Sequence, residues 1–419
     1  MIRVKKIAKI FICYVITAII FLCVFLYFGK NINIAEHNDN TNNTDNTAGL
    51  SETVAITEIP ELPEISENLI EDITEISDKT EEPTKIIYTL DYNYDDPDYY
   101  EPSESVKYYK QITLREILFS AVGDLTLGMN WSKPYAGSFY EYYDLYGPGY
   151  FCENVKPVFD ASDCVIANLE CALTDNQDPE IRQNKPYTYK GYTEYTSILT
   201  AGSIDVVNIA NNHSYDYSEV GYNDTIDALN NEGIGYFGNG TALIKEINGI
   251  KVGFLGCREV MWRWELKAGL DYLTENGAEI KIASFHWGNM DERTANENQV
   301  YIAHYAIDNG ADLVIGHHPH VLQGIEEYKG KYIAYSLGNF IFDGNIISDI
   351  ENRTSIIFQQ RFVLYGSNIV ESSINLIPIL GTSNAWIKNF KPMLAEGEQK
   401  EDILNKIAER SAKAEQAEQ

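Results

Sequence analysis

Three histidines lie within one short loop, and neutral imidazole is the side chain that most often binds metal ions in proteins. The loop follows a short apolar run and reads His317-His318-Pro319-His320 after Gly316. The chain contains only 7 histidines, so this clustering favours a site over a chance surface loop. Because side chains alternate along an extended chain, His318 and His320 are expected on the same side. The loop therefore predicts a metal-binding or catalytic site.

Polar residues also follow several other apolar runs. Strands are predicted at 117–122, 164–167, 205–210, 279–285, 313–315 and 331–335, with helices at 218–231 and 297–309. Apolar strands that alternate with helices are typical of an α/β fold in which helices cover the sheets. Sheets of this kind bind ligands at the carboxyl ends of their strands. The polar residues at these ends are therefore predicted to form one site.

The candidate site residues are Asp124, Asn168, Glu170, Asn212, His213, Asp216, His286, His318 and His320. Carboxylates, amides and imidazoles together suit Mn, Fe or Zn better than Ca, which prefers oxygen ligands alone. The set is large enough to hold one or two divalent ions. A bound ion of this kind lowers the pKa of a coordinated water and so provides a nucleophile near neutral pH. A histidine outside the ligand set would then protonate the leaving group.

Each candidate also has a structural interpretation when it is taken alone. Asp124 could cap a turn or a helix, and the Asn212-His213 pair could shape a turn. His286 beside Trp287 could be a core histidine. Only the shared placement at strand ends favours function for the whole set. A structural role or no role is predicted for the other polar residues considered, which are His37, His304, His317 and Asn339.

Composition excludes some classes of protein. The formal net charge is -30, and a nucleic-acid partner is not expected because phosphate binding needs basic surface. The 419 residues are 44% hydrophobic, which is enough for a sizeable core. None of the 6 cysteines forms a CxxC pair, so a cysteine zinc site is not predicted. One or two disulfides remain open if the domain is extracellular.

The first part of the chain is predicted to be a membrane anchor. Basic residues precede an uncharged apolar run at 10–28, which is close to the length that spans a bilayer. The positive charges should stay in the cytoplasm, which places the rest of the chain outside the cell. No A-x-A-like cleavage site follows the run, so an uncleaved anchor is favoured over a removed signal peptide. The predicted location is the cell membrane, with a single pass.

The remaining chain divides by composition. Residues 31–111 are rich in acidic residues, Asn, Thr and Pro, and are predicted to form a disordered acidic stalk. The α/β domain is predicted at 112–380. Residues 381–419 are predicted to be a helical tail, with an amphipathic helix at 401–414 that either packs on the domain or trails free. Residues 1–30 are the fourth predicted segment, which comprises the basic N-terminal end and the membrane anchor.

Six stretches of this sequence resemble the CapA family of poly-gamma-glutamate capsule biosynthesis proteins. They occur in the family's order between about residues 116 and 345, and they read GDLTLG (123–128), NLE (168–170), NNHSYDY (211–217), HWG (286–288), GADLVIGHHPHVLQG (310–324) and YSLGNF (335–340). That family is similar to the calcineurin-like metallophosphatases. The resemblance implies a four-layer α-β-β-α sandwich of two sheets with helices outside.

The resemblance also implies roles for individual residues. Asn212 would be a metal ligand and His213 the general acid. Further ligands would be Asp124, Glu170, His286, His318 and His320. The sequence departs from the family pattern at Met129-Asn130, which follows GDLTLG, and at Asn289 to Glu292, which follows HWG. These differences are expected to affect contacts with the substrate more than metal binding. The family itself lacks the opening Asp-x-His of the phosphatases, which implies that one of two metal sites is weakened.

Two functions from different classes follow from this resemblance. The first is a metal-dependent hydrolase outside the membrane that acts on an anionic exopolymer such as poly-gamma-glutamate. The second is a non-catalytic scaffold or polymer-binding subunit that assembles with other membrane capsule-synthesis proteins. His213 with Asp216 favours catalysis, whereas the predicted anchor and stalk favour assembly. Because the chain is strongly acidic, polymer binding would need a local basic groove, for which the candidates are Lys185, Lys190, Arg258 and Arg263.

Overall fold

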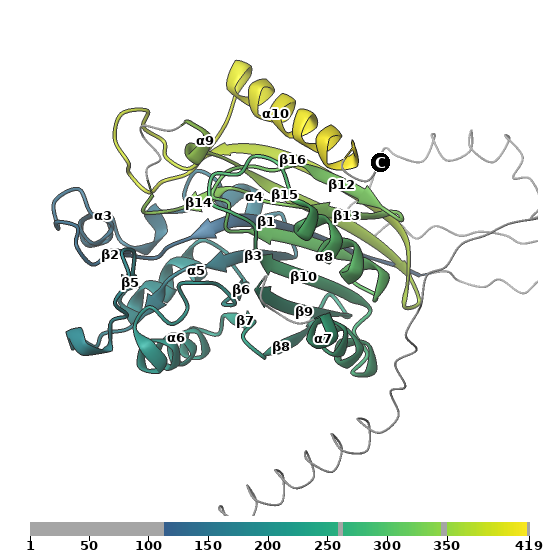
Figure 1. Cartoon of the computed structure of the whole chain (residues 1–419), viewed down its shortest axis with the longest axis horizontal. Helices are drawn as coiled ribbons and strands as arrows, with labels where there is room; N and C mark the ends of the chain where they lie inside the picture. Colours follow the sequence, from purple (N-terminus) through teal and green to yellow (C-terminus); the bar gives the residue numbers. More distant parts are fainter. Residues whose placement is uncertain (1–112, 259–262, 345–349, 417–419) are drawn as a thin grey trace, which may run out of the picture. The chain divides into compact units, whose positions relative to one another are not determined.

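The apolar runs of the sequence form two large β-sheets (Figure 1). The computed structural model describes residues 113–258, 263–344 and 350–416. The first sheet has the order β17 (Met393–Leu394), β16 (Asn368–Leu380), β15 (Thr354–Tyr365), β1 (Leu114–Leu125), β3 (Cys164–Leu169), β6 (Val206–Asn208) and β7 (Gly235–Phe237), and β14 (Asn339–Ile341) pairs with the end of β1. The second has the order β12 (Ile325–Tyr328), β13 (Lys331–Ala334), β11 (Leu313–His317), β10 (Ile280–His286), β9 (Ile250–Arg258) and β8 (Ala242–Ile247).

Helices and a small third sheet complete the described residues. The third sheet has the order β2 (Met129–Asn130), β5 (Tyr189–Gly191) and β4 (Ala172–Leu173). The α-helices are α3 (Phe139–Tyr146), α4 (Lys156–Asp160), α5 (Ser197–Ala201), α6 (Ser218–Glu232), α7 (Arg263–Glu275), α8 (Glu297–Asp308), α9 (Ile350–Arg353) and α10 (Gly397–Gln416). Short 3-10 helices occur at η1 (Pro148–Tyr150), η2 (Pro179–Ile181) and η3 (Thr193–Thr196).

Three buried clusters show how the layers stack. The middle cluster takes side chains from both sheets, including Phe119 and Ile166 of the first and Phe254 and Ile282 of the second. A second cluster joins the other face of the first sheet to α4, α5 and α6. The third joins the other face of the second sheet to α7 and α8. Because each sheet is apolar on both faces, both faces are covered, and the predicted α-β-β-α order of layers is observed.

The helix boundaries follow local capping chemistry. Helix α6 ends at Gly233, which adopts a left-handed φ of 77° and donates its N–H to the last turn. Helix α8 begins with a capping box, in which Asn296 and Gln299 exchange side-chain and backbone hydrogen bonds. Both helices lie where the periodicity predicted them. Strand β1 runs three residues beyond the predicted end at 122, because β14 and β3 pair in parallel with Asp124 and Leu125.

Gly316 is required where β11 passes close to the chain at Tyr335. A Cβ at this position would lie 1.9 Å from the carbonyl oxygen of Tyr335 and 2.6 Å from Nε1 of Trp287. Gly316→Ala is therefore expected to lower the free energy of unfolding by about 3 kcal/mol or more, because the backbone must shift. Gly149→Ala is the control, since nothing lies within 4 Å of its added Cβ. Equal urea midpoints for the two variants would contradict the close packing.

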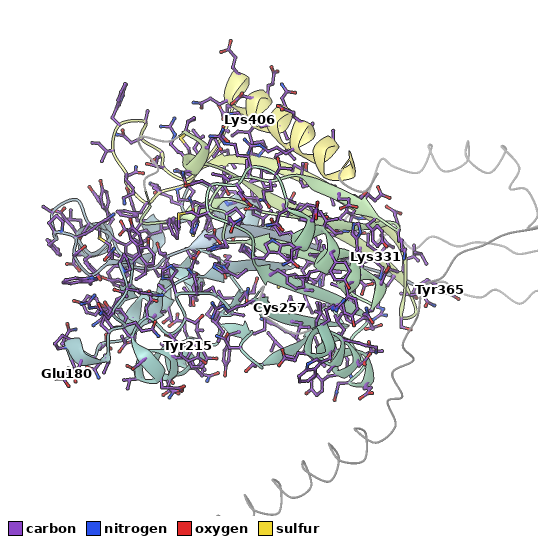
Figure 2. The ribbon with its side chains drawn as sticks, viewed as in Figure 1. Glu180, Tyr215, Cys257, Lys331, Tyr365 and Lys406 are labelled. Atoms are coloured by element: carbon purple, nitrogen blue, oxygen red, sulfur yellow. The ribbon has the colours of Figure 1, made fainter. Side chains whose placement is uncertain are left out.

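The predicted C-terminal tail contributes to the same layers. Strand β17 pairs with β16, and α10 buries Ile403 and Ile407 in the middle cluster. Figure 1 shows α10, in yellow, above β12 and β16, and Figure 2 labels Lys406 on this helix. The helix is also held by Arg410, which is buried, pairs with Glu351 and donates to the carbonyl of Leu322 at 2.6 Å. Of the two alternatives left open for the amphipathic helix, packing on the domain is observed.

The pair between Arg410 and Glu351 predicts a measurable, pH-dependent contribution to stability. Arg410→Met is expected to lower the free energy of unfolding by about 3–5 kcal/mol, because it leaves a buried carboxylate without its main partner. Burial alone would raise the pKa of Glu351, but Arg410 and Lys406 hold it below its ordinary value. A carboxylate with a lowered folded-state pKa stabilises the fold above the pKa of the unfolded chain, about 4.3. The difference between wild type and variant should therefore shrink as the pH falls below that value.

Chemical denaturation at several pH values measures this difference. Lys267→Met is the control, because its partner Asp271 is about half exposed and such surface pairs contribute about 0–1 kcal/mol. A wild-type to Arg410→Met difference that stays constant from neutral to acidic pH would contradict the role given to Glu351.

Two predictions from the sequence concern the N-terminal residues and the cysteines. The predicted anchor at 10–28 and the stalk lie outside the described residues. Among residues 113–258, 263–344 and 350–416, no helix has the length and apolar character needed to cross a bilayer. Cys152, Cys164, Cys171 and Cys257 are buried free thiols, so no disulfide links these four. Burial raises the pKa of Cys152 to about 12, which leaves this thiol protonated.

Candidate metal centre and catalytic site

The carboxyl ends of strands from both large sheets meet at one edge, and all nine predicted site residues lie there. Strands β1 and β3 are parallel and end near Asp124 and Asn168, which are register partners. Strands β10 and β11 are parallel and pair His286 with His317, directly before the histidine loop. The loop after β6 carries Asn212, His213 and Asp216. Parallel pairing therefore brings together side chains that are far apart in the sequence.

Glu170 is at the centre of this site. Its side chain is fully buried, and neither carboxylate oxygen has a hydrogen-bond partner among the described residues. Its Oε1 atom lies 3.6 Å from Nε2 of His286, 3.8 Å from Nε2 of His213 and 3.8 Å from Nε2 of His320. Burial, with smaller effects from Asp124 and Asp216, raises the pKa of Glu170 well above its ordinary value. A cation would stabilise this carboxylate where the protein alone does not.

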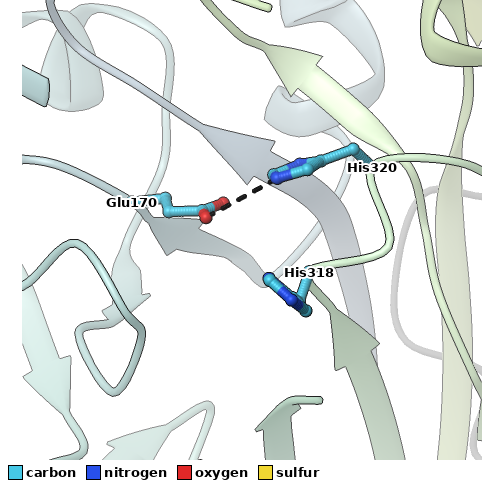
Figure 3. A group of neighbouring side chains, drawn as sticks. All are labelled: Glu170, His318 and His320. Atoms are coloured by element: carbon cyan, nitrogen blue, oxygen red, sulfur yellow. Dashed lines mark ion pairs between the residues drawn. The ribbon is translucent and has the colours of Figure 1, made fainter. Parts of the chain in front are cut away.

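Two groups of ligand atoms at this edge have the spacing needed to hold an ion. Atoms of Glu170, His318 and His320 lie within 4.8 Å of one another, and so do atoms of Asp124, Glu170 and His286. Figure 3 shows the first group, with Glu170 facing His320 and with His318 on the same side. Glu170 belongs to both groups. The donor set therefore fits one or two divalent cations that accept carboxylate and imidazole ligands.

Asp124 differs from Glu170 because the protein already satisfies its carboxylate. Oδ1 accepts from the amide of Asn168 at 2.9 Å, and Oδ2 accepts from the backbone N–H of His318 at 3.3 Å. Nδ1 of His320 lies 2.9 Å from the same Oδ2 atom. Burial favours the neutral acid, but the nearby imidazoles of His317 and His320 hold the pKa of Asp124 well below its ordinary value. The anionic Asp124 therefore fixes the ring of His320.

The hydrogen bonds of His320 determine which of its nitrogens is available to an ion. Nδ1 lies between two acceptors, Oδ2 of Asp124 and Oδ1 of Asn339, the latter at 3.0 Å. Nδ1 must therefore carry the proton, which leaves the lone pair of Nε2 directed to the side of Glu170. This arrangement matches the common pattern in which a second residue orients a metal-ligating histidine. Asn339 thus orients a predicted ligand, a role that goes beyond the turn predicted for it.

Two further residues make contacts that the sequence did not reveal. The side-chain oxygen of Asn168 accepts from Asn211 at 3.2 Å while its amide donates to Asp124, so its hydrogen bonds fit an orienting role. His317 is buried with Nδ1 3.5 Å from Oδ1 of Asp124, so it faces the site where a purely structural position was predicted. Its place in the histidine run was the only sequence signal for this contact.

The histidine loop is held in an unusual backbone conformation. His318 has a φ of 98° and His320 a φ of 58°, on either side of Pro319. Left-handed backbone at residues other than glycine costs on the order of 1–3 kcal/mol each and is common at functional sites. The bonds from Asp124 and Asn339 hold this loop in place. The strained backbone thus lowers the stability of the fold, and in return it directs the imidazoles of His318 and His320 toward Glu170.

His213 and Asp216 form a buried pair next to Glu170. Nδ1 of His213 lies 2.7 Å from Oδ2 of Asp216, and since a carboxylate only accepts, Nδ1 is the donor. Asp216 is held by the backbone N–H of Tyr189 at 2.6 Å and by Lys185. Burial lowers the pKa of His213, while Asp216 opposes that effect. The arrangement leaves Nε2 of His213 as the atom that faces the site.

The predicted basic groove is only partly present. Lys185 lies at the site, but its ammonium pairs with Asp216 and donates to the carbonyl of Asn212 at 2.7 Å. Lys190 is buried and donates to the carbonyl of Asn176. Arg263 contacts Tyr301 of α8 in the opposite helix layer. Arg258 ends β9 in register with His286, so it is the candidate that stays at the edge of the site.

Comparisons with known proteins identify the family. The model of the family described as "Bacterial capsule synthesis protein PGA_cap" matches residues 118–344, which is more than half of the chain. "PGA biosynthesis protein CapA" of Bacillus subtilis (strain 168) is 31% identical over 212 residues, covering 45% of this chain and 56% of that protein. "Capsule biosynthesis protein CapA" of Bacillus anthracis is 28% identical over 268 residues, covering 58% and 63%. The chain thus matches less than two thirds of the length of these two relatives.

Two solved structures are more distantly similar. A hypothetical protein from Thermus thermophilus has a TM-score of 0.38 and 17% identity, covering 63% of this chain and 99% of that one. The 5'-nucleotidase from Candida albicans has a TM-score of 0.37 and 11% identity, covering 72% and 58%. The assignment to a family rests on the family model and not on these two structures. The matched range includes Asp124, Glu170, His213, His286 and the histidine loop. The chain belongs to the bacterial capsule synthesis protein PGA_cap family.

Proposed function

We propose that this protein is a metal-dependent hydrolase of capsule or exopolymer biosynthesis, anchored in the cell membrane with its catalytic domain outside. The polymer class we propose is an anionic chain such as poly-gamma-glutamate, in keeping with the names of the two Bacillus relatives. The membrane location is supported by the basic residues and the apolar run at 10–28. Other membrane capsule-synthesis subunits are the partners that we propose for it.

One observation carries the catalytic part of the proposal. Glu170 is a fully buried carboxylate without a hydrogen-bond partner among the described residues, and three imidazole nitrogens lie within 3.8 Å of its Oε1 atom. A group that only held the fold together would be paired, as Asp124 is. The ligands we propose are Glu170, His286, His318, His320, Asp124 and Asn212, and the ion we propose is Mn, Fe or Zn.

A bound divalent ion would supply Lewis acidity and a water of lowered pKa. The protein's own residues then explain how the reaction is completed. Asp216 holds the Nδ1 proton of His213, so Nε2 is the atom that exchanges protons with the reacting groups. Hydrolysis adds OH to the acyl or phosphoryl group, and the proton that His213 passes on goes to the leaving nitrogen or oxygen. Asp216 stabilises the imidazolium that forms, as in other histidine and carboxylate pairs.

The first test measures metal content and hydrolysis on the same full-length protein. Mn, Fe and Zn per chain are quantified, and turnover is assayed with a phosphodiester and with a gamma-linked glutamyl polymer. His318→Ala is expected to lose both metal and turnover, whereas His213→Ala is expected to keep metal and lose turnover. A wild-type protein without stoichiometric metal, after loading with each ion, would contradict the ligand set. Stoichiometric metal without turnover on either substrate would favour the non-catalytic scaffold or polymer-binding subunit.

A further inference from the structure

Two lysines outside the metal centre converge on one buried carboxylate. Nζ of Lys388 lies 2.6 Å from Oδ1 of Asp343, and Nζ of Lys133 lies 2.9 Å from the same atom. The side chain of Asp343 is fully buried, while those of Lys133 and Lys388 are 38% and 16% exposed. Two ammonium groups share one carboxylate, so the cluster keeps a net positive charge at the surface.

Each ammonium group also keeps a donor for a ligand. Lys133 uses two N–H groups, to the backbone carbonyl and to Oδ1 of Asp343. Lys388 uses two as well, to Oδ1 of Asp343 and to the carbonyl of Gly344. An ammonium has three donors, so among the described residues one N–H remains on each lysine. A single anionic oxygen placed against both would complete the cluster.

The cluster lies beside the metal centre through the residue that precedes Asp343. The ring of Phe342 packs against His320 with centroids 4.3 Å apart, and against Tyr189 at 5.5 Å. Tyr189 in turn contacts the ring of His213 at 4.7 Å. The segment that carries Asp343 therefore contacts the site through its neighbour Phe342.

A second cationic group lies beside Trp131, which is close to Lys133 in the chain. The guanidinium of Arg182 stacks on the ring of Trp131 at 3.9 Å, and Trp131 is 55% exposed. Trp131 is two residues from Lys133, and the next residue after Arg182, Gln183, donates its N–H to the carbonyl of Asp216 at 2.8 Å. Arg182 has no carboxylate within ion-pair distance among the described residues. A cation without a partner in such an acidic protein is available for an anionic ligand.

We propose that Lys133, Lys388 and Arg182, with Trp131 between them, form a strip that binds successive carboxylates of an extended acidic polymer beside the metal centre. The chain segments around the strip also contact the site, through Phe342 against His320 and through Gln183, which donates its N–H to the carbonyl of Asp216. It deepens the proposed function and rests on it. Cations that are separated along the strip match a polymer whose carboxylates repeat along its length. The flat ring of Trp131 offers an apolar contact for the stretches of polymer between those carboxylates.

Binding of defined poly-gamma-glutamate oligomers to the full-length, metal-loaded protein tests the strip. The variants are Lys133→Met, Arg182→Met and the double change, with Lys388 left in place because it keeps Asp343 neutralised. The control is Lys267→Met with Lys329→Met, which removes two exposed lysines from other surfaces and alters the net charge equally. Each single change at the strip is expected to weaken binding by about tenfold, or about 1.4 kcal/mol, and the control to leave it unchanged.

Metal content and thermal midpoint, measured on every variant, show whether the fold and the metal centre are intact. Wild-type affinity in the double variant, with the wild type binding the oligomer, would overturn the strip alone. Tighter binding of inorganic polyphosphate than of the oligomer at equal charge would overturn the assignment to carboxylates. Metal-loaded wild type that neither binds nor hydrolyses the oligomer would overturn the polymer substrate proposed above, and the strip with it.

Discussion

Glu170→Gln is expected to remove metal binding without lowering the stability of the metal-free protein. The change keeps the shape of the side chain but removes the negative charge that two groups of ligand atoms share. Metal affinity should fall by more than about 100-fold, since changes to residues that only orient ligands already cost about 10–100-fold. The metal-free fold should not weaken, because Glu170 makes no hydrogen bond with the described residues that the change could break.

Glu351→Gln is the matched control, since it makes the same change at another buried glutamate. Glu351 pairs with Arg410 and Lys406 of α10, so its loss should lower stability while metal binding stays intact. Thermal midpoints with and without added metal measure both properties together, because an ion that binds only the folded state raises the midpoint. A Glu170→Gln protein that keeps the metal-dependent rise, or that loses stability as Glu351→Gln does, would contradict the role given to Glu170.

His213→Gln is expected to reduce turnover by about 10²–10⁴-fold, the range typical for loss of a positioned general acid. Metal content should stay at the wild-type level, because His213 bonds to Asp216 through Nδ1 and lies outside both groups of potential ligand atoms. The loss should depend on the leaving group. A substrate that releases a weakly basic group needs no proton donor, so it should be hydrolysed at close to the wild-type rate.

Rates with matched substrates that differ only in the leaving group measure this dependence. His304→Gln is the control, because His304 lies in α8, stacks on Tyr328 at 3.8 Å and bonds to Glu326 away from the metal centre. Its turnover should stay near the wild-type value for every substrate. An equal loss for good and poor leaving groups in His213→Gln would show that the residue positions other groups and does not donate the proton.

Much of this protein can be predicted from local patterns. Apolar runs identified the main strands, and glycine and capping residues identified the ends of α6 and α8, because these features depend on neighbours in the chain. The nine candidate site residues were also identifiable, since each lies at the end of an apolar strand or in the loop after it, and parallel strands bring their carboxyl ends to one edge. The histidine loop and the other motifs then indicated the family that the comparisons confirm.

The roles within that set depended on contacts between distant parts of the chain. Nothing near Glu170 or Asp124 in the sequence reveals that the first has no hydrogen-bond partner among the described residues whereas Asn168 and His320 satisfy the second. The position of Asn339 against His320 follows from the pairing of β14 with β1, which joins residues more than two hundred positions apart.

The basic residues show the same distinction. Lys190 and Arg263 had the right charge for a polymer groove, but one is buried and the other lies in the opposite helix layer. Lys133 and Lys388 carry no motif, yet folding places both against Asp343. The sequence by itself determined which residues could do chemistry and near which strand ends they would lie. Only the tertiary structure decided which carboxylate lacks a hydrogen-bond partner among the described residues and which lysines pair with a buried carboxylate, because burial and long-range pairing set those properties.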